Sequence, residues 1–215
     1  MGDNPLKLER DLDSYVMDNI LYKVSFPAEF HAQTAAEAAI SLSSEVKGKI
    51  HDIKEIKIFT QEPGVRIISK KGPLNNFADR DHCIEYIVAW CLLNGNLNSN
   101  SYSDSSASDE NIDKLRKLTN TVEDQAYTRS YYDLDERAIP NKVVVSMITG
   151  EVYEKEVIYP LGHKKRRAES LPFLKEKFEK SIEKADIRVD ELMKFYDEKN
   201  LDSINIYDLL NCIYK

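Results

Sequence analysis

The stretch Lys142–Tyr159, which reads KVVVSMITGEVYEKEVIY, carries the clearest strand signals in the chain. Its two halves, Lys142–Ile148 and Val152–Tyr159, are rich in β-branched and aromatic residues, which pack well on the pleated surface of a sheet. The residues between them include Gly150, and a short glycine-containing connection between two such runs is typical of a β-hairpin. The stretch therefore predicts two antiparallel strands.

Two segments nearer the N-terminus are also predicted to be extended. Ile53–Thr60, IKEIKIFT, mostly alternates apolar with charged residues, which is the period of a half-buried strand. Val65–Ser69 then predicts a second strand or extended piece.

The helical patterns are longest in the first half of the chain. His31–Val46 is rich in alanine, the best helix former, and its small residues repeat on one narrow face, which implies close packing. Cys83–Leu93 is apolar nearly all round and predicts a buried helix, with Asp81 as its N-cap and Gly95 as its end.

The rest of the chain predicts shorter elements. Helices are expected at Asn111–Thr119, from an N-cap at Ser170 onward, at Val189–Glu198 and at Ile204–Tyr214, and the Ser- and Asn-rich residues 96–110 are expected to form a mobile surface loop. Because strands and helices mix without regular βαβ alternation, the predicted fold class is α+β. We expect a small mixed or antiparallel sheet packed with helices, in one domain of residues 1–215.

Composition restricts the classes of partner and function that the chain can have. The chain has 215 residues, 42% of them hydrophobic, enough for one sizeable core. The formal net charge of −7 argues against nucleic acid as a partner. No apolar run approaches the roughly 18 residues that cross a bilayer, so we expect no membrane partner. The three cysteines have no C-x-x-C spacing, which indicates reduced, buried thiols.

Common catalytic motifs are missing from the sequence. There is no Walker loop, no G-x-G-x-x-G, no G-x-S-x-G, no H-E-x-x-H and no paired cysteine, so nucleotide, serine-hydrolase and zinc chemistry have no support. We expect no metal site.

The first candidate site is the segment Lys70–Tyr86. It places Lys70, Lys71, Arg80, His82 and Tyr86 at a loop and a helix entry, with His82 and Tyr86 one helical turn apart. Such groups can bind carboxylates and move protons. In the alternative interpretation the lysines are solvated, Arg80 pairs with a neighbouring aspartate and His82 is a surface residue at a helix start.

The second candidate is Lys23–His31, where a lysine, a proline turn, Glu29 and His31 precede the alanine-rich helix. Alternatively, Glu29 is a carboxylate at a helix N-terminus and His31 an ordinary first-turn residue. A third cluster, His163–Arg167, is consecutively basic or titratable. It is either a solvated turn or a surface for an anion or a partner.

Several of these stretches resemble the MmgE/PrpD family. They are Ser14–Asn19, Lys23–Ala35, Lys70–Asn76, Ala78–Cys83, Glu123-Asp124, Asp135–Ile139 and Tyr159–His163, with the similarity continuing to Phe178. The resemblance covers roughly residues 13–181 and is to the smaller, C-terminal α+β domain of the family. It implies that a larger N-terminal helical domain, present in family members, is absent here.

The resemblance also implies an activity: metal-independent dehydration of 2-methylcitrate to 2-methyl-cis-aconitate, a step of propionate breakdown. That reaction needs a base, an acid and cations for three carboxylates, and no cofactor. We expect a homodimer in the full-length enzyme. The Ser- and Asn-rich style of the sequence favours a location in the mitochondrial matrix, with a bacterial cytoplasm as the alternative. The alternatives are another PrpD-type lyase or isomerase of tricarboxylates, and a noncatalytic fragment that acts by association.

The same resemblance assigns roles to residues. His82 and Tyr86 match a catalytic His and Tyr four residues apart in a related decarboxylase branch, whereas Lys23 and His31 match a catalytic Lys and His only approximately. Lys70, Lys71 and Arg80 are expected to bind substrate. We expect Lys23, Lys71, Arg80 and His82 to converge on one anion pocket, and this chain alone to be inactive because it carries one wall of the site.

Overall fold

The computed structural model describes residues 19–182, 191–192, 194–196 and 205–213. The chain divides into two compact units, residues 1–167 and 168–215, where the sequence predicts one domain. The first unit contains the sheet and the helices that cover it. This combination confirms the α+β fold class.

The sheet has four strands in the order β2-β1-β3-β4. The predicted hairpin is confirmed as β3 (Asn141–Met147) and β4 (Val152–Val157), and the alternating segment as β1 (Ile53–Thr60). β3 runs antiparallel to β1 and to β4. The fourth strand, β2 (Thr119–Glu123), was not predicted and pairs parallel to β1, so the sheet is mixed.

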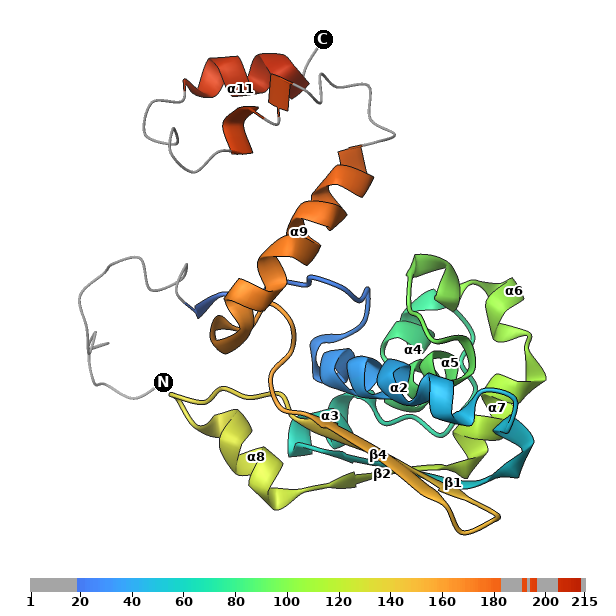
Figure 1. Cartoon of the computed structure of the whole chain (residues 1–215). Helices are drawn as coiled ribbons and strands as arrows, with labels where there is room; N and C mark the ends of the chain where they lie inside the picture. The colour runs from blue at the N-terminus through green and yellow to red at the C-terminus, as the bar shows by residue number, and fades with distance from the viewer. Residues whose placement is uncertain (1–18, 183–190, 193, 197–204, 214–215) are drawn as a thin grey trace, which may run out of the picture. The chain divides into compact units, whose positions relative to one another are not determined.

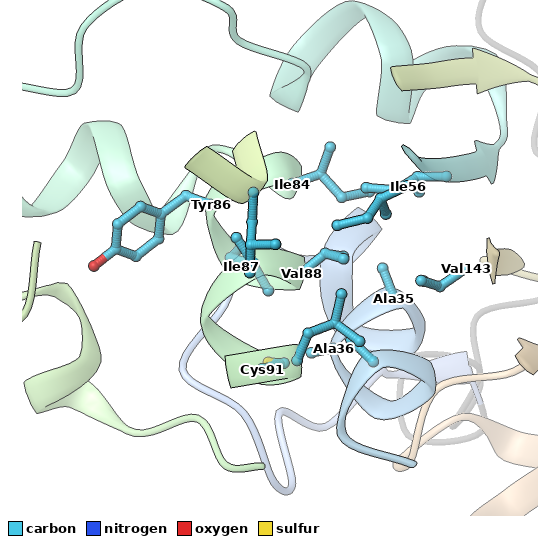
Figure 2. Packing of buried hydrophobic residues seen from close by; sticks show 14 of the residues in the cluster. Ala35, Ala36, Ile56, Ile84, Tyr86, Ile87, Val88, Cys91 and Val143 are labelled. Atoms are coloured by element: carbon cyan, nitrogen blue, oxygen red, sulfur yellow. The ribbon is translucent and has the colours of Figure 1, made fainter. Parts of the chain in front are cut away.

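Two helices form the main layer over this sheet, α2 (Gln33–Val46) and α5 (Ile84–Asn94). The predicted close packing of α2 is confirmed, because its alanines at 35, 36, 38 and 39 are fully buried. Figure 2 shows Ala35 and Ala36 facing the side chains of α5 and the strand residue Val143. α5 ends at Gly95, as predicted, in a left-handed conformation with φ of 68°.

Two local predictions in this unit are wrong. Val65–Ser69 is not a strand, because Glu62–Ile68 forms helix α3 with Pro63 in its first turn, where a proline costs no hydrogen bond. Asp81 does not cap α5, because it is the last residue of a short helix, α4 (Phe77–Asp81), and Cys83 takes the N-cap position of α5.

The Ser- and Asn-rich segment is also more ordered in structure than a surface loop. It contains η3 (Ser99–Tyr102), which starts with a capping box at Asn98, and α6 (Asp104–Ala107). Tyr102 is fully buried, so the segment contributes to the core, where the sequence predicts a surface loop. The predicted helix after it is confirmed as α7 (Glu110–Leu118).

The remaining elements are helical. The first unit also has η1 (Phe30–Ala32), η2 (Ile50–Asp52), α8 (Gln125–Tyr132) and η4 (Lys164–Arg166). α9 (Arg167–Ile182), η5 (Lys194–Tyr196) and α11 (Ile206–Ile213) follow. Because α9 begins at Arg167, Ser170 lies inside that helix and is not its N-cap. The prediction at Val189–Glu198 lies partly outside the described residues, and that at Ile204–Tyr214 is confirmed over α11.

The three cysteines are free and buried, as expected. Within the described ranges, no helix is long and apolar enough to cross a membrane.

Candidate active site

The first unit contains a cavity of about 430 Å³ next to the N-terminal end of α2. It is lined by Asn19, Leu21, Phe30, His31, Tyr131, Tyr132, Leu134, Arg137, Ile139, His163 and Lys164. These residues come from four stretches of the chain. Proton-transfer groups, cations and apolar side chains therefore face one space.

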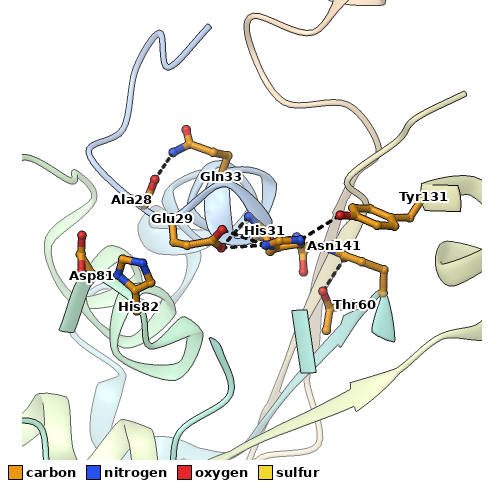
Figure 3. Close-up of polar contacts among 10 residues, drawn as sticks. Ala28, Glu29, His31, Gln33, Thr60, Asp81, His82, Tyr131 and Asn141 are labelled. Carbon is orange, nitrogen blue, oxygen red and sulfur yellow. Dashed lines mark hydrogen bonds and ion pairs between the residues drawn. The ribbon is translucent and has the colours of Figure 1, made fainter. Parts of the chain in front are cut away.

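His31 is held in this cavity by Glu29 (Figure 3). The imidazole Nδ1 lies 2.8 Å and 3.0 Å from the two carboxylate oxygens of Glu29, and the backbone N–H of His31 donates to the same carboxylate at 2.8 Å. A carboxylate only accepts hydrogen bonds, so Nδ1 carries a proton and Nε2 of the neutral ring is a hydrogen-bond acceptor. Burial opposes the charge on Glu29, but hydrogen bonding and charge from His31 together hold its pKa below the ordinary value.

The backbone around His31 is anchored as firmly as its ring. The Asn141 amide donates to the carbonyl oxygen of His31 and to the hydroxyl of Thr34, both at 2.7 Å. The Gln33 amide donates to the carbonyls of Phe26 and Ala28, which flank the proline turn. His31 therefore has one preorganised position.

Tyr131 is the second proton-transfer group of the cavity. It lies on α8, which begins where the Asp124 carboxylate accepts hydrogen bonds from the backbone N–H groups of Ala126 and Tyr127. Its hydroxyl lies 3.3 Å from His31 Nε2, and it donates there if the ring is neutral. Burial raises the pKa of Tyr131, so this hydroxyl keeps its proton at neutral pH.

Two cations lie on the same cavity wall, Arg137 and Lys164. Arg137 has a φ of 42°, a conformation that few residues other than glycine adopt. Next to Lys164, the buried ring of His163 accepts a hydrogen bond from Lys165 N at 3.2 Å. Burial, followed by the charge of Lys164, lowers the pKa of His163, so it is a neutral part of the wall.

The segment before α2 rests against the turn that carries His163. The backbone N–H of Tyr22 donates to the carbonyl of Gly162, and Gly162 has a φ of 93°. A side chain at position 162 would collide with the Tyr22 carbonyl oxygen. Glycine therefore lets Asn19 and Leu21 form one side of the cavity.

A second predicted histidine, His82, lies close to the Glu29–His31 pair. The backbone N–H of Glu29 donates to the carbonyl of Asp81 at 3.3 Å, and the charge of His82 contributes to lowering the pKa of Glu29. His82 itself is half-exposed, and its Nδ1 lies 2.6 Å from the carboxylate of Asp81. His82 therefore lies behind Glu29 and does not line the cavity.

The other sequence-predicted residues lie elsewhere in the unit. The Lys23 ammonium lies 5.3 Å from the ring centre of Phe30. Lys70 pairs with Asp79, and Lys71 donates to the carbonyl of Thr119.

Arg80 and Tyr86 lie in the interior. The buried guanidinium of Arg80 donates to the carbonyl of Tyr102 and pairs with Asp104, not with Asp79 or Asp81. The hydroxyl of Tyr86 donates to the carbonyl of Ser101 at 2.6 Å. None of Lys23, Lys71, Arg80 and His82 lines the cavity, so the structure does not bring them into the expected common pocket there.

Sequence reasoning missed Tyr131 and did not single out Arg137. Arg137 lies in Asp135–Ile139, a stretch that carries the family resemblance, and this was a usable signal. The basic run was only partly a solvated turn, because His163 is buried and Arg166 forms a two-bond ion pair with Glu37 on α2. Among the described residues, no group of three or more His, Cys, Asp or Glu side chains could hold a metal ion.

The sequence of the chain matches one family of known proteins. Residues 26–194 match the family model described as the MmgE/PrpD C-terminal domain, and the chain belongs to this family. Its relatives include 2-methylcitrate dehydratases, named as such in several organisms.

A mitochondrial 2-methylcitrate dehydratase from Yarrowia lipolytica is 49% identical over 185 residues, which are 84% of this chain and 36% of the relative. A 2-methylcitrate dehydratase from Escherichia coli K12 is 48% identical over 80% of this chain and 36% of its own length. A probable 2-methylcitrate dehydratase from Saccharomyces cerevisiae is 45% identical over 90% of this chain and 39% of its own length. The chain thus spans less than half the length of these relatives.

Proposed function

We propose that this chain forms the C-terminal part of a hydro-lyase that dehydrates 2-methylcitrate to 2-methyl-cis-aconitate, a reaction of propionate breakdown. The names of the relatives support the reaction, and the Glu29–His31–Tyr131 contacts support the place where it occurs. The observation that carries the proposal is His31, whose ring is fixed by Glu29 and whose other nitrogen faces the cavity.

His31 acts as the base in this proposal. Its Nε2 takes the proton from the carbon next to a substrate carboxylate, and the Glu29 carboxylate stabilises the imidazolium that forms. Tyr131 gives its proton to the hydroxyl that leaves, and water departs as the electron pair of the C–H bond forms the double bond. The imidazolium Nε2, 3.3 Å from the Tyr131 hydroxyl, then returns the proton to Tyr131. Proton and hydroxide are removed from adjacent carbons, which gives the double bond and one water.

Arg137 and Lys164 hold substrate carboxylates, because both are cations on the wall of the same cavity. In this proposal the remaining groups come from the larger helical domain that the family resemblance implies. We further propose a homodimer. We also propose a location in the mitochondrial matrix, which the name of the yeast relative supports, with a bacterial cytoplasm as the alternative.

A grafted enzyme tests this proposal. Residues 26–194 of this chain replace the matching part of the Yarrowia lipolytica relative, and dehydration of 2-methylcitrate is followed by absorbance of the new double bond. We expect turnover by the graft and a loss of at least about a hundredfold in kcat for His31→Asn. The exposed His51 gives the matched control, His51→Asn. A folded graft without turnover, or an active His31→Asn graft, would contradict the proposal.

A further inference from the structure

Part of the cavity lining is apolar and takes no part in proton transfer or in the binding of carboxylates. Leu21, Phe30, Leu134 and Ile139 line it together with the polar groups. Ile139 is buried, with 4% of its surface exposed, whereas Leu134 is 71% exposed. A single exposed leucine is ordinary on a protein surface, but this one borders a cavity that also contains Arg137.

A hydrogen-bonded turn fixes the backbone around the exposed Leu134. The Asp133 carboxylate accepts hydrogen bonds from the backbone N–H groups of Asp135 and Glu136, both at 2.9 Å. The N–H of Arg137 donates to the carbonyl of Asp133 at 2.8 Å. These contacts close the turn on both sides of Leu134.

The same turn sets the position of the cation relative to the leucine. Arg137 Nε donates to the carbonyl of Leu134 at 3.2 Å, and its φ of 42° ends the turn. A strained backbone that is held in this way is common at ligand sites. The turn therefore presents one apolar and one cationic side chain to the same space.

We propose that Leu134 selects the substrate by contacting an alkyl branch on the carbon next to the carboxylate that Arg137 binds. This inference rests on the proposed function and adds the residue that distinguishes 2-methylcitrate from citrate, which lacks the branch. Burial of one methyl group against Leu134 makes binding of the branched ligand about fourfold tighter. The polar contacts are the same for both ligands.

Binding to the full 215-residue chain tests the inference without requiring turnover. The chain is labelled at its leucine methyl groups, and the resonances of the cavity residue Leu21 are identified by their absence in Leu21→Ala. These resonances report the dissociation constants for 2-methylcitrate and citrate in the wild type and in Leu134→Ala. We expect the wild type to bind 2-methylcitrate about fourfold more tightly than citrate. Leu134→Ala should bring the ratio close to one and leave citrate binding within about twofold.

Leu118→Ala is the matched control, because Leu118 is a partly exposed leucine on α7 that does not line the cavity. It should keep the wild-type ratio. If Leu134→Ala also keeps the ratio, or if the wild type has no preference, the role of Leu134 is overturned while the proposed function stands. If neither ligand shifts any cavity resonance, the inference is overturned and the cavity is no longer supported as the substrate site, a failure that the grafted enzyme detects separately.

Discussion

Glu29 is the residue that connects the local sequence to the chemistry of the cavity. Its carboxylate both caps η1 and holds the His31 ring. The two interpretations of this segment are therefore not exclusive, because one carboxylate performs the structural and the positioning role.

Replacing Glu29 with Gln tests the positioning role. Gln can still accept the hydrogen bond from Nδ1, but it cannot stabilise the imidazolium by charge. We expect kcat of the grafted enzyme to fall at least about tenfold with KM little changed, because the interaction is made mainly in the transition state. Glu45→Gln, at an exposed position of α2, should have no effect, and an equal rise in KM would instead indicate a binding role.

Tyr86 is the residue whose predicted role the structure most directly questions. Its side chain is 2% exposed, its hydroxyl bonds the Ser101 carbonyl, and burial raises its pKa to about 12. We expect Tyr86→Phe to lower the free energy of unfolding by about 1–2 kcal/mol, because a buried carbonyl loses its donor, with turnover of the grafted enzyme nearly unchanged. A hundredfold loss of turnover at constant Tm would support the catalytic role that the family resemblance implies.

His163 gives the chain a predictable pH dependence. Because its pKa is lowered in the folded state, the unfolded chain takes up a proton first as the pH falls below about 6.5. The free energy of unfolding therefore decreases from neutral pH downward until the pH passes the folded pKa.

Asn at position 163 can accept the hydrogen bond from Lys165 N but cannot titrate. We expect His163→Asn to make the decrease in Tm between about pH 7 and pH 5 shallower than in the wild type. Thermal melts at several pH values measure this slope. An unchanged slope would show that the pH dependence comes from other groups.

At the scale of elements, helix α2 depends on its small side chains. Ala36 is fully buried at the contact of α2 with α5. We expect Ala36→Leu to lower the free energy of unfolding by about 1–3 kcal/mol, because the added atoms force neighbours out of their rotamers. Ser44→Leu, at an exposed position of the same helix, should change stability by less than about 0.5 kcal/mol, and urea unfolding compares the two.

The segment between α5 and α7 shows how polar sequence can join a core. Tyr102 stacks on Tyr86 and contacts Phe77, and the Arg80 guanidinium binds its carbonyl. A single aromatic residue and one buried cation therefore attach a Ser- and Asn-rich segment to α4 and α5. Composition alone does not reveal such an attachment.

The whole chain should fold but should be a poor catalyst of the dehydration. The buried residues of the sheet and of α2, α5 and α7 form one contiguous core, whereas the cavity is bordered by exposed Tyr132 and Leu134. We expect residues 1–215 to melt cooperatively and to dehydrate 2-methylcitrate at least about a hundredfold more slowly than the grafted enzyme, because orientation and water exclusion are incomplete. Equal rates would show that the site is complete within this chain.

Elements whose signals are local could be predicted from the amino-acid sequence alone. The hairpin, β1, α2 and α5 follow from hydrophobic periodicity, from alanine content and from glycine at turns and helix ends, and Glu29 and His31 were recognised because they lie two residues apart. The family resemblance also came from contiguous stretches. Where local signals conflicted, as at Pro63 and Asp81, the sequence prediction was wrong.

Which distant groups meet depends on the three-dimensional fold and could not be predicted. Tyr131 lies 100 residues from His31 in the sequence. β2 pairs with β1 only because the helical segment from α3 to α7 connects them as a crossover. Contacts of this kind depend on the simultaneous packing of several elements, and no short window of sequence contains that information. The burial of Tyr86 and Arg80 was hidden for the same reason, because their partners are backbone carbonyls of a segment whose composition resembles a loop.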